Sequence, residues 1–121
     1  MRFIQEIGYT VKIGKDEAHQ RWLIENDAAL RAAAPKGTKY IGTFAVVMSS
    51  EKSAGSYKQL IELDSYGALD AAAAANKDPK SELGRLLRDW SQFIDTDLAA
   101  PWSNAILKDV IDATIWDPKK G

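Results

Sequence analysis

The stretch DEAHQRWLIENDAALRAAA, residues 16–34, is the one from which the rest of the fold can be inferred. At about 100° per residue its apolar side chains form one stripe along a helix. The members of this stripe are Trp22, Leu23, Ala29, Leu30, Ala33 and Ala34. Asp16 is a suitable N-cap, and Pro35 must end the helix. The stretch therefore predicts an amphipathic helix over residues 16–34 that packs on another element.

Two polar side chains, His19 and Asn26, interrupt the buried face of this helix. They are seven residues apart, which places them within about 20° of each other around the helix and about 10 Å apart along it. Trp22 lies between them. Two hydrogen-bonding groups beside an indole are typical of a pocket for a small, flat ligand, although His19 and Asn26 are equally suited to bonding nearby backbone groups.

Alternating or apolar segments on both sides of the helix predict strands. Residues 3–15 alternate, with Gln5 as the exception on the apolar side, and residues 57–63 alternate again. Residues 38–49 and about 104–116 are apolar on both faces. The segment between Ser49 and Ser56 is rich in Ser and Gly and is expected to be a mobile hairpin connection.

A second helical region, in two pieces, precedes the last strand. The first piece begins near Tyr66 after the possible caps Asp64 and Ser65, and runs through five alanines to Asn76. Asp78 and Pro79 are expected to open the second piece. In it apolar residues recur at helical spacing: Leu83, Leu86, Leu87, Trp90, Phe93 and Ile94. The resulting order, β-α-β-β-α-β, predicts an α+β, ferredoxin-like fold whose four-stranded antiparallel sheet carries its helices on one face.

Composition predicts a single domain over residues 1–121 and excludes several classes of function. The 16 basic and 17 acidic residues alternate along the chain, which argues against nucleic acid as a partner. The chain has no cysteine and one histidine, which excludes a thiolate or histidine-rich metal site within one chain and leaves a carboxylate-bound cation open. No motif signals such a cation, so we expect neither a metal nor a cofactor. The N-terminal residues lack the apolar core of a secretory signal, and no apolar run approaches the ~20 residues of a membrane helix. We expect a cytoplasmic protein with no membrane partner.

The apolar residues on both faces of residues 38–49 and 104–116 predict a homodimer. A monomer would expose one face of the sheet to water, leaving an apolar patch larger than monomers usually carry. A second copy of the same sheet packed against that face removes the patch. A monodisperse monomer in light scattering would contradict this expectation.

Taken together, these features resemble the dimeric α+β barrel superfamily, nearest to its EthD-like (ethyl tert-butyl ether degradation) and NIPSNAP-like groups. The resemblance is carried by the element order, by Gly-Thr-Lys-Tyr-Ile-Gly at residues 37–42, and by His19, Trp22 and Leu30. In EthD-like proteins a Trp follows the helix His by three residues, as Trp22 does here. Asn26 stands where that pattern has a second His, and Asp27-Ala28 replaces its Gly-Pro.

The resemblance implies two sheets packed as a barrel in a dimer. It also brings a choice of activities, because the superfamily includes cofactor-independent monooxygenases, isomerases, haem-degrading enzymes and proteins of unknown role. Under an enzymatic reading, His19 is the candidate base and Asn26 orients an aromatic or polycyclic substrate. Tyr9, Tyr40 and Tyr57 are candidate ligand contacts, with core or interface packing as their alternative.

Three hypotheses follow from the sequence. The protein is a small-molecule enzyme, or a non-catalytic ligand-binding dimer, or a structural dimer with a filled interior. Among the remaining polar and aromatic residues, Asp109 is expected to pair with a basic side chain, while Trp90 and Trp102 are expected to pack.

Overall fold

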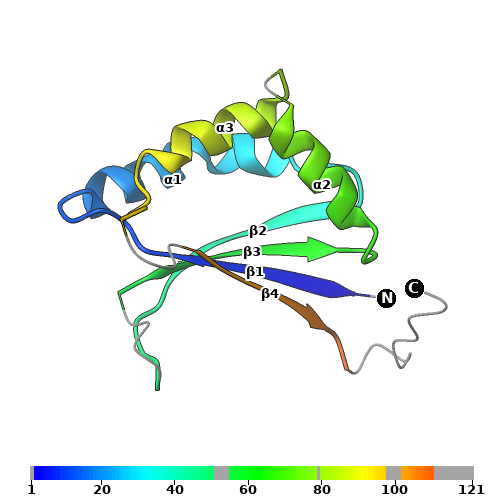
Figure 1. Ribbon diagram of the computed structural model, residues 1–121, viewed down its shortest axis with the longest axis horizontal. Coiled ribbons are helices and arrows are strands. Elements are labelled where there is room, and N and C mark those ends of the chain that lie inside the picture. Colours follow the sequence, from blue (N-terminus) through cyan, green and yellow to red (C-terminus); the bar gives the residue numbers. More distant parts are fainter. Residues whose placement is uncertain (1, 51–54, 79, 98–101, 111–121) are drawn as a thin grey trace.

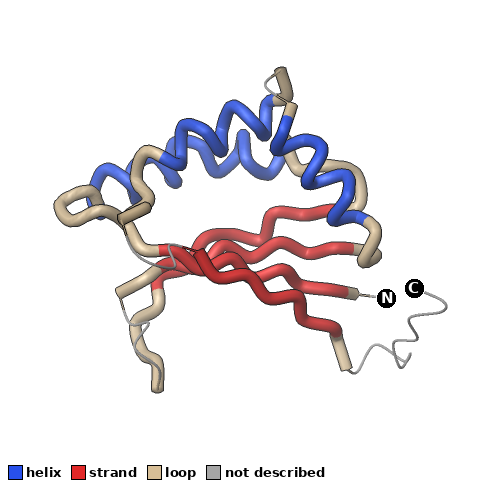
Figure 2. Tube along the Cα trace, viewed as in Figure 1, coloured by secondary structure: helices blue, strands red, loops and turns tan. Residues whose placement is uncertain are grey.

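The computed structural model describes residues 2–50, 55–78, 80–97 and 102–110. Their elements follow in the order β1 (Phe3–Tyr9), α1 (Asp16–Ala32), β2 (Thr38–Ala45), β3 (Tyr57–Leu63), α2 (Ala68–Lys77), α3 (Glu82–Ser91) and β4 (Trp102–Lys108). The strands form one sheet in the order β2-β3-β1-β4, with every neighbouring pair antiparallel. Figures 1 and 2 show the three helices in a single layer over one face of this sheet. The predicted ferredoxin-like α+β fold is confirmed.

The core lies between the helix layer and the sheet. Tyr9 on β1 pairs directly with Tyr57 on β3, and both side chains are buried in this core. Directly paired residues of neighbouring strands lie on the same face of a sheet. The larger cluster of buried residues contains Tyr9, Val11, Trp22, Leu30, Tyr40, Tyr57, Leu86, Trp90, Phe93 and Ile94. A smaller one contains Phe3, Leu63 and Ala68. Both the stripe of α1 and the apolar repeat of α3 contribute as predicted.

β3 has the bounds predicted from the sequence, whereas β1 and β2 are shorter than their sequence patterns. β1 ends at Tyr9, beyond which Val11 forms only an isolated bridge with Ile94, and Ile13 is 99% exposed. The reason is the length of its neighbours, because Tyr9 pairs with the first residues of both β3 and β4. β2 likewise ends at Ala45, opposite Tyr57. β4 begins two residues earlier than predicted.

The helix ends also differ from the prediction. α1 is capped by Lys15 without a side-chain bond, and the Asp16 carboxylate instead accepts a hydrogen bond of 3.0 Å from the Tyr57 hydroxyl. α3 starts after Ser81, whose Oγ accepts from the backbone N–H of Gly84, and not after Asp78. α1 ends two residues before Ala34. The predicted mobile connection falls partly, and the end of the predicted last strand wholly, outside the described residues.

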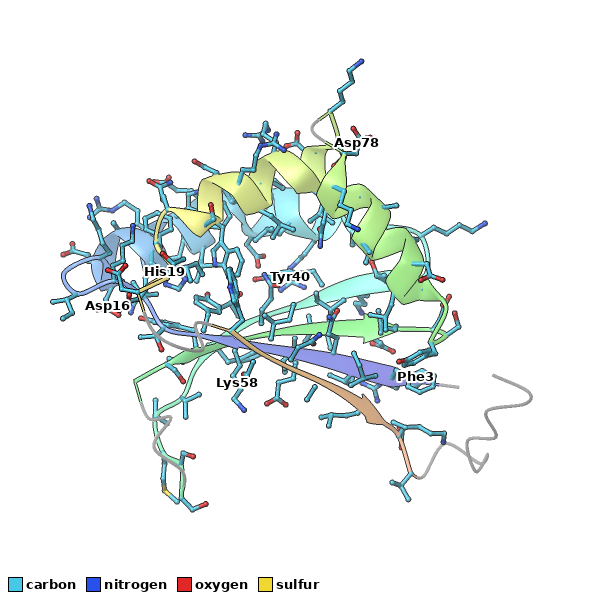
Figure 3. The ribbon with its side chains drawn as sticks, viewed as in Figure 1. Phe3, Asp16, His19, Tyr40, Lys58 and Asp78 are labelled. Carbon is cyan, nitrogen blue, oxygen red and sulfur yellow. The ribbon has the colours of Figure 1, made fainter. Side chains whose placement is uncertain are left out.

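The face of the sheet opposite the helices combines charges with apolar side chains. Glu6 and Lys58 form an ion pair there, and Figure 3 shows Lys58 on the opposite side of the sheet from His19 and Tyr40. Towards the outer strands, Phe44 and Leu107 are 49% and 47% exposed. The described residues contain no helix long and apolar enough to cross a membrane.

At the C-terminal end of β4, Asp109 lies 3.7 Å from the guanidinium of Arg2. Arg2 also contacts Glu62 on β3, with its Nε 3.2 Å from the carboxylate. The predicted pairing of Asp109 with a basic side chain is confirmed.

Candidate functional site

A cavity of about 470 Å³ lies between the helix layer and the sheet. The sheet contributes Gln5, Ile7, Thr38, Tyr40, Gln59, Ile61 and Trp102. The helices and the turn after α1 contribute Leu30, Ala34, Pro35, Leu69, Ala72, Ala73, Asn76, Leu83, Leu87 and Trp90. The cavity reaches the surface where Ala73, Asn76 and Trp102 are exposed.

The alanine run of α2 explains why this space stays open. Ala72 and Ala73 face the cavity, and a methyl group is too short to reach the sheet below it. Longer apolar side chains on α1 and α3 pack against the other end of the sheet, around His19 and Phe93. The helix layer also contacts the sheet at the start of α2, where Ala68 packs with Phe3 and Leu63, and the alanines further along α2 stand over the cavity.

Few polar groups line the cavity, and none of its described lining residues is charged. The Tyr40 hydroxyl shares a hydrogen bond of 2.6 Å with Thr43 Oγ1, and burial raises the pKa of this phenol. The Gln5 amide donates to Asn104 Oδ1 over 3.2 Å. Gln59 is only 5% exposed, and within the described chain its carboxamide has no hydrogen-bond partner.

His19 lies at the other end of the core, with its ring wholly buried among aromatic side chains. Its centroid is 4.4 Å from that of Tyr57 and 5.7 Å from that of Phe93. Its Nε2 shares a hydrogen bond of 2.7 Å with the Tyr9 hydroxyl, whereas Nδ1 has no partner among the described residues. Burial lowers the pKa of His19, an effect that nearby Asp16 opposes, so the neutral imidazole is favoured.

The hydroxyl of Tyr9 connects this cluster to the cavity wall. Burial raises the pKa of Tyr9, while the indole N–H of Trp90 acts in the opposite direction by stabilising the phenolate. That N–H approaches the hydroxyl without the geometry of a good hydrogen bond, and it has no other partner in the described chain. Trp90 thus contacts Tyr9 and also lines the cavity.

The residues predicted for the site do not lie together in the structure. Tyr9, His19 and Tyr57 are together, but Tyr40 alone among the predicted residues lines the cavity. The Trp22 indole donates to Asp89 Oδ2 over 2.6 Å and ties α1 to α3.

Asn26 also lies apart from the cavity, because its side chain donates to the carbonyl of Trp22 over 2.9 Å. Asn26 therefore bonds a nearby backbone group, which is the alternative to a ligand contact that its sequence position left open. Direct contact of His19 with a ligand in this cavity requires the surrounding side chains to move, and its role as a base stays a prediction.

It was not predicted from the sequence that Gln5 and Gln59, or the α2 alanines Ala72 and Ala73, would line a cavity. A signal was present, because Gln5 breaks the apolar alternation of β1 and Gln59 stands on the buried face of β3 between Tyr57 and Ile61. The register places the two glutamines diagonally on neighbouring strands, with Gln5 opposite Ile61 and Gln59 opposite Ile7. In the described part of the chain, no three His, Asp or Glu side chains gather to form a metal site.

No protein-family model matches this chain, and no curated protein does. Among solved structures it resembles a NIPSNAP family protein from Agrobacterium tumefaciens, with a TM-score of 0.65, 15% identity, and 93% of this chain and 96% of that one covered. The chain shares its fold with NIPSNAP family proteins. An uncharacterized NIPSNAP-like domain protein from Burkholderia xenovorans gives a TM-score of 0.63 at 14% identity, covering 98% and 97%.

The same fold occurs in a Nitrosomonas europaea protein suggested to be an antibiotic biosynthesis monooxygenase. The TM-score is 0.56 and the identity 12%, with 92% of each chain covered. At such identities the likeness concerns the fold, and any activity must be argued from the site. The predicted resemblance to NIPSNAP-like proteins is confirmed at this level, and that to EthD-like proteins stays a prediction.

Proposed function

We propose that this protein binds a small, largely apolar organic molecule in the cavity between the helices and the sheet. The observation that carries the proposal is the cavity itself, whose volume of about 470 Å³ falls within the range of known small-molecule pockets. Its wall is mainly apolar with a few polar side chains, which is the usual composition of such sites. An interior of this kind is not the filled one that a purely structural dimer requires.

Two tryptophans favour an aromatic ligand. The rings of Trp90 and Trp102 lie with centroids 5.5 Å apart at an angle of 51°, and both line the cavity. Trp90 is buried, whereas Trp102 is 46% exposed at the surface. A flat ring entering beside Trp102 gains contact with both indoles, since aromatic faces and edges attract one another at this spacing.

The alanines of α2 provide the test. Ala72 lines the cavity, whereas Ala74 is exposed and does not, so Ala72→Phe fills the site and Ala74→Phe is its matched control. With 2-ethylnaphthalene as the probe and tryptophan fluorescence as the readout, we expect Ala72→Phe to weaken binding at least tenfold and Ala74→Phe to leave it unchanged. Equal binding by all three proteins, or none by the unaltered protein, would contradict the proposal.

A second candidate is catalysis without a cofactor, as a monooxygenase or an isomerase. The hydrogen-bonded pair of Tyr9 and His19, which adjoins the cavity wall through Trp90, favours it. Oxidation of 1-naphthol to 1,4-naphthoquinone and water uses one O₂, with all electrons supplied by the substrate, and oxygen uptake measures it. Loss of turnover in His19→Ala with affinity retained would support His19 as the base, whereas unchanged turnover would exclude that role.

We also propose that a second copy of the chain covers the open face of the sheet. Phe44 and Leu107 are about half exposed there, and a depression of about 490 Å³ beside Phe44 is lined by both Glu6 and Lys58. The opposite charges of these two side chains permit their ion pairs to be exchanged across a two-fold axis. Location in the cytoplasm, expected from the sequence, stays a prediction.

A further inference from the structure

The side chain of Gln59 is almost wholly buried, and its carboxamide faces the cavity without a hydrogen-bond partner among the described residues. It lines the cavity from the middle of the sheet and is 5% exposed. Burying an amide without hydrogen bonds is unfavourable, and most buried polar side chains in proteins have partners. An unpaired donor and acceptor that face a cavity are therefore suited to a ligand.

The surroundings of Gln59 define the charge of that ligand. None of the described residues lining the cavity is charged, so nothing there compensates a carboxylate or an ammonium group brought out of water. The neighbouring Gln5 already donates its amide hydrogen to Asn104, and the third lining amide, Asn76, is exposed to solvent. Gln59 is therefore the buried lining amide whose donor and acceptor are both unused. Trp90 and Trp102 add a preference for a flat ring.

We propose that Gln59 anchors a neutral, planar aromatic ligand through a carboxamide, lactam or similar group that presents a donor beside an acceptor. Such a group forms two hydrogen bonds with the Gln59 carboxamide, one in each direction. A carboxylate of the same shape has two acceptors and no donor. One of its oxygens accepts a hydrogen bond from the Gln59 amide group, but the other meets the Gln59 carbonyl oxygen with no hydrogen bond between them. The inference rests on the proposed binding function and specifies the chemical class of its ligand.

Three naphthalene derivatives of similar shape separate the contributions of hydrogen bonding, charge and apolar contact to binding. Naphthalene-2-carboxamide carries the paired donor and acceptor, 2-naphthoate carries a charge, and 2-ethylnaphthalene carries neither. By calorimetry at pH 7.5 we expect the carboxamide to bind at least tenfold more tightly than 2-naphthoate. Gln59→Met should weaken binding of the carboxamide about tenfold and change the affinity for 2-ethylnaphthalene by less than twofold. Gln20 lies outside the cavity, so Gln20→Met should change neither affinity.

The stability of Gln59→Met is a second readout. If the glutamine serves a ligand, removing its unpaired amide should raise the Tm of the empty protein, whereas loss of a structural glutamine should lower it. Binding of 2-ethylnaphthalene without preference for the carboxamide over 2-naphthoate would overturn the role of Gln59 alone. Failure of the unaltered protein to bind any of the three would overturn the proposed function, and this inference with it.

Discussion

The burial of His19 determines its chemistry because the ring is enclosed and its Nδ1 has no partner among the described residues. In the unfolded chain a histidine titrates near pH 6.5, while burial holds the pKa of the folded His19 below that value. As the pH falls below about 6.5, the unfolded chain therefore takes up the proton first. The contribution of His19 to stability is complete above that pH and decreases at lower pH, by at most ~1.4 kcal/mol per pH unit.

Comparison with His19→Gln measures this effect. The glutamine keeps a hydrogen-bonding group near Tyr9 but does not titrate, so the acid-induced decrease attributable to His19 should disappear. In urea unfolding at pH 7.5 and 5.5, we expect the free energy of unfolding to fall by about 1 kcal/mol more in the unaltered protein than in the variant. Parallel changes in the two proteins would show that the buried ring titrates as it does when unfolded.

Single residues were the least predictable part of the site. The position of His19 beside the apolar stripe indicated burial, but its contact with Tyr9 depends on a strand ten residues earlier in the chain. Asn26 has the same position on the helix two turns later and turns back to its own backbone. Gln59 is a polar residue on the buried face of β3, and the sequence alone does not show that a cavity opens above it.

At the scale of elements, the start of α3 depends on one serine. Ser81 Oγ accepts the backbone N–H of Gly84 over 2.9 Å, while Ser65, expected from the sequence to cap the preceding helix, makes no such bond. Ser81→Ala should lower the free energy of unfolding by about 1 kcal/mol, because it leaves a helix N–H unpaired. Ser65→Ala should change it by less than about 0.5 kcal/mol. Urea unfolding compares the two, and equal losses would contradict the assignment.

The type of each element was easier to predict from the sequence than the residues at which it begins and ends. The apolar repeat of α3 and the alternation of β3 fix the type of each element, since burial acts on the whole segment. The ends depend on partners elsewhere in the fold. Asp16 looks like a cap from the sequence but bonds Tyr57, and β1 ends at Tyr9 because its neighbouring strands begin there.

At the scale of the whole molecule, the order of elements was sufficient to predict the sheet and the single layer of helices. Strands connected through helices pack in few ways, and the ferredoxin-like order is one of them. The cavity was not predictable in the same way. It results from the tilt of an alanine-rich helix over the sheet, and five alanines indicate a helix without indicating what lies beneath it.

The open face of the sheet gives the last prediction, which concerns assembly. A stable dimer needs an interface of at least ~1,000 Å², and the apolar side chains of the two outer strands, with the Glu6–Lys58 pair between them, are candidates for its centre. Replacing both Phe44 and Leu107 by lysine places like charges against each other across the two-fold axis. Light scattering at micromolar concentration should give twice the mass of one chain for the unaltered protein and a single mass for this variant.

Ile24→Lys is the matched control for this experiment, because Ile24 is 80% exposed on α1, on the opposite side of the molecule from this face. The control should keep the doubled mass. Dissociation of both variants would indicate a general effect of added charge and not a specific interface. A single mass for the unaltered protein would contradict the dimer and would confine the cavity to one chain.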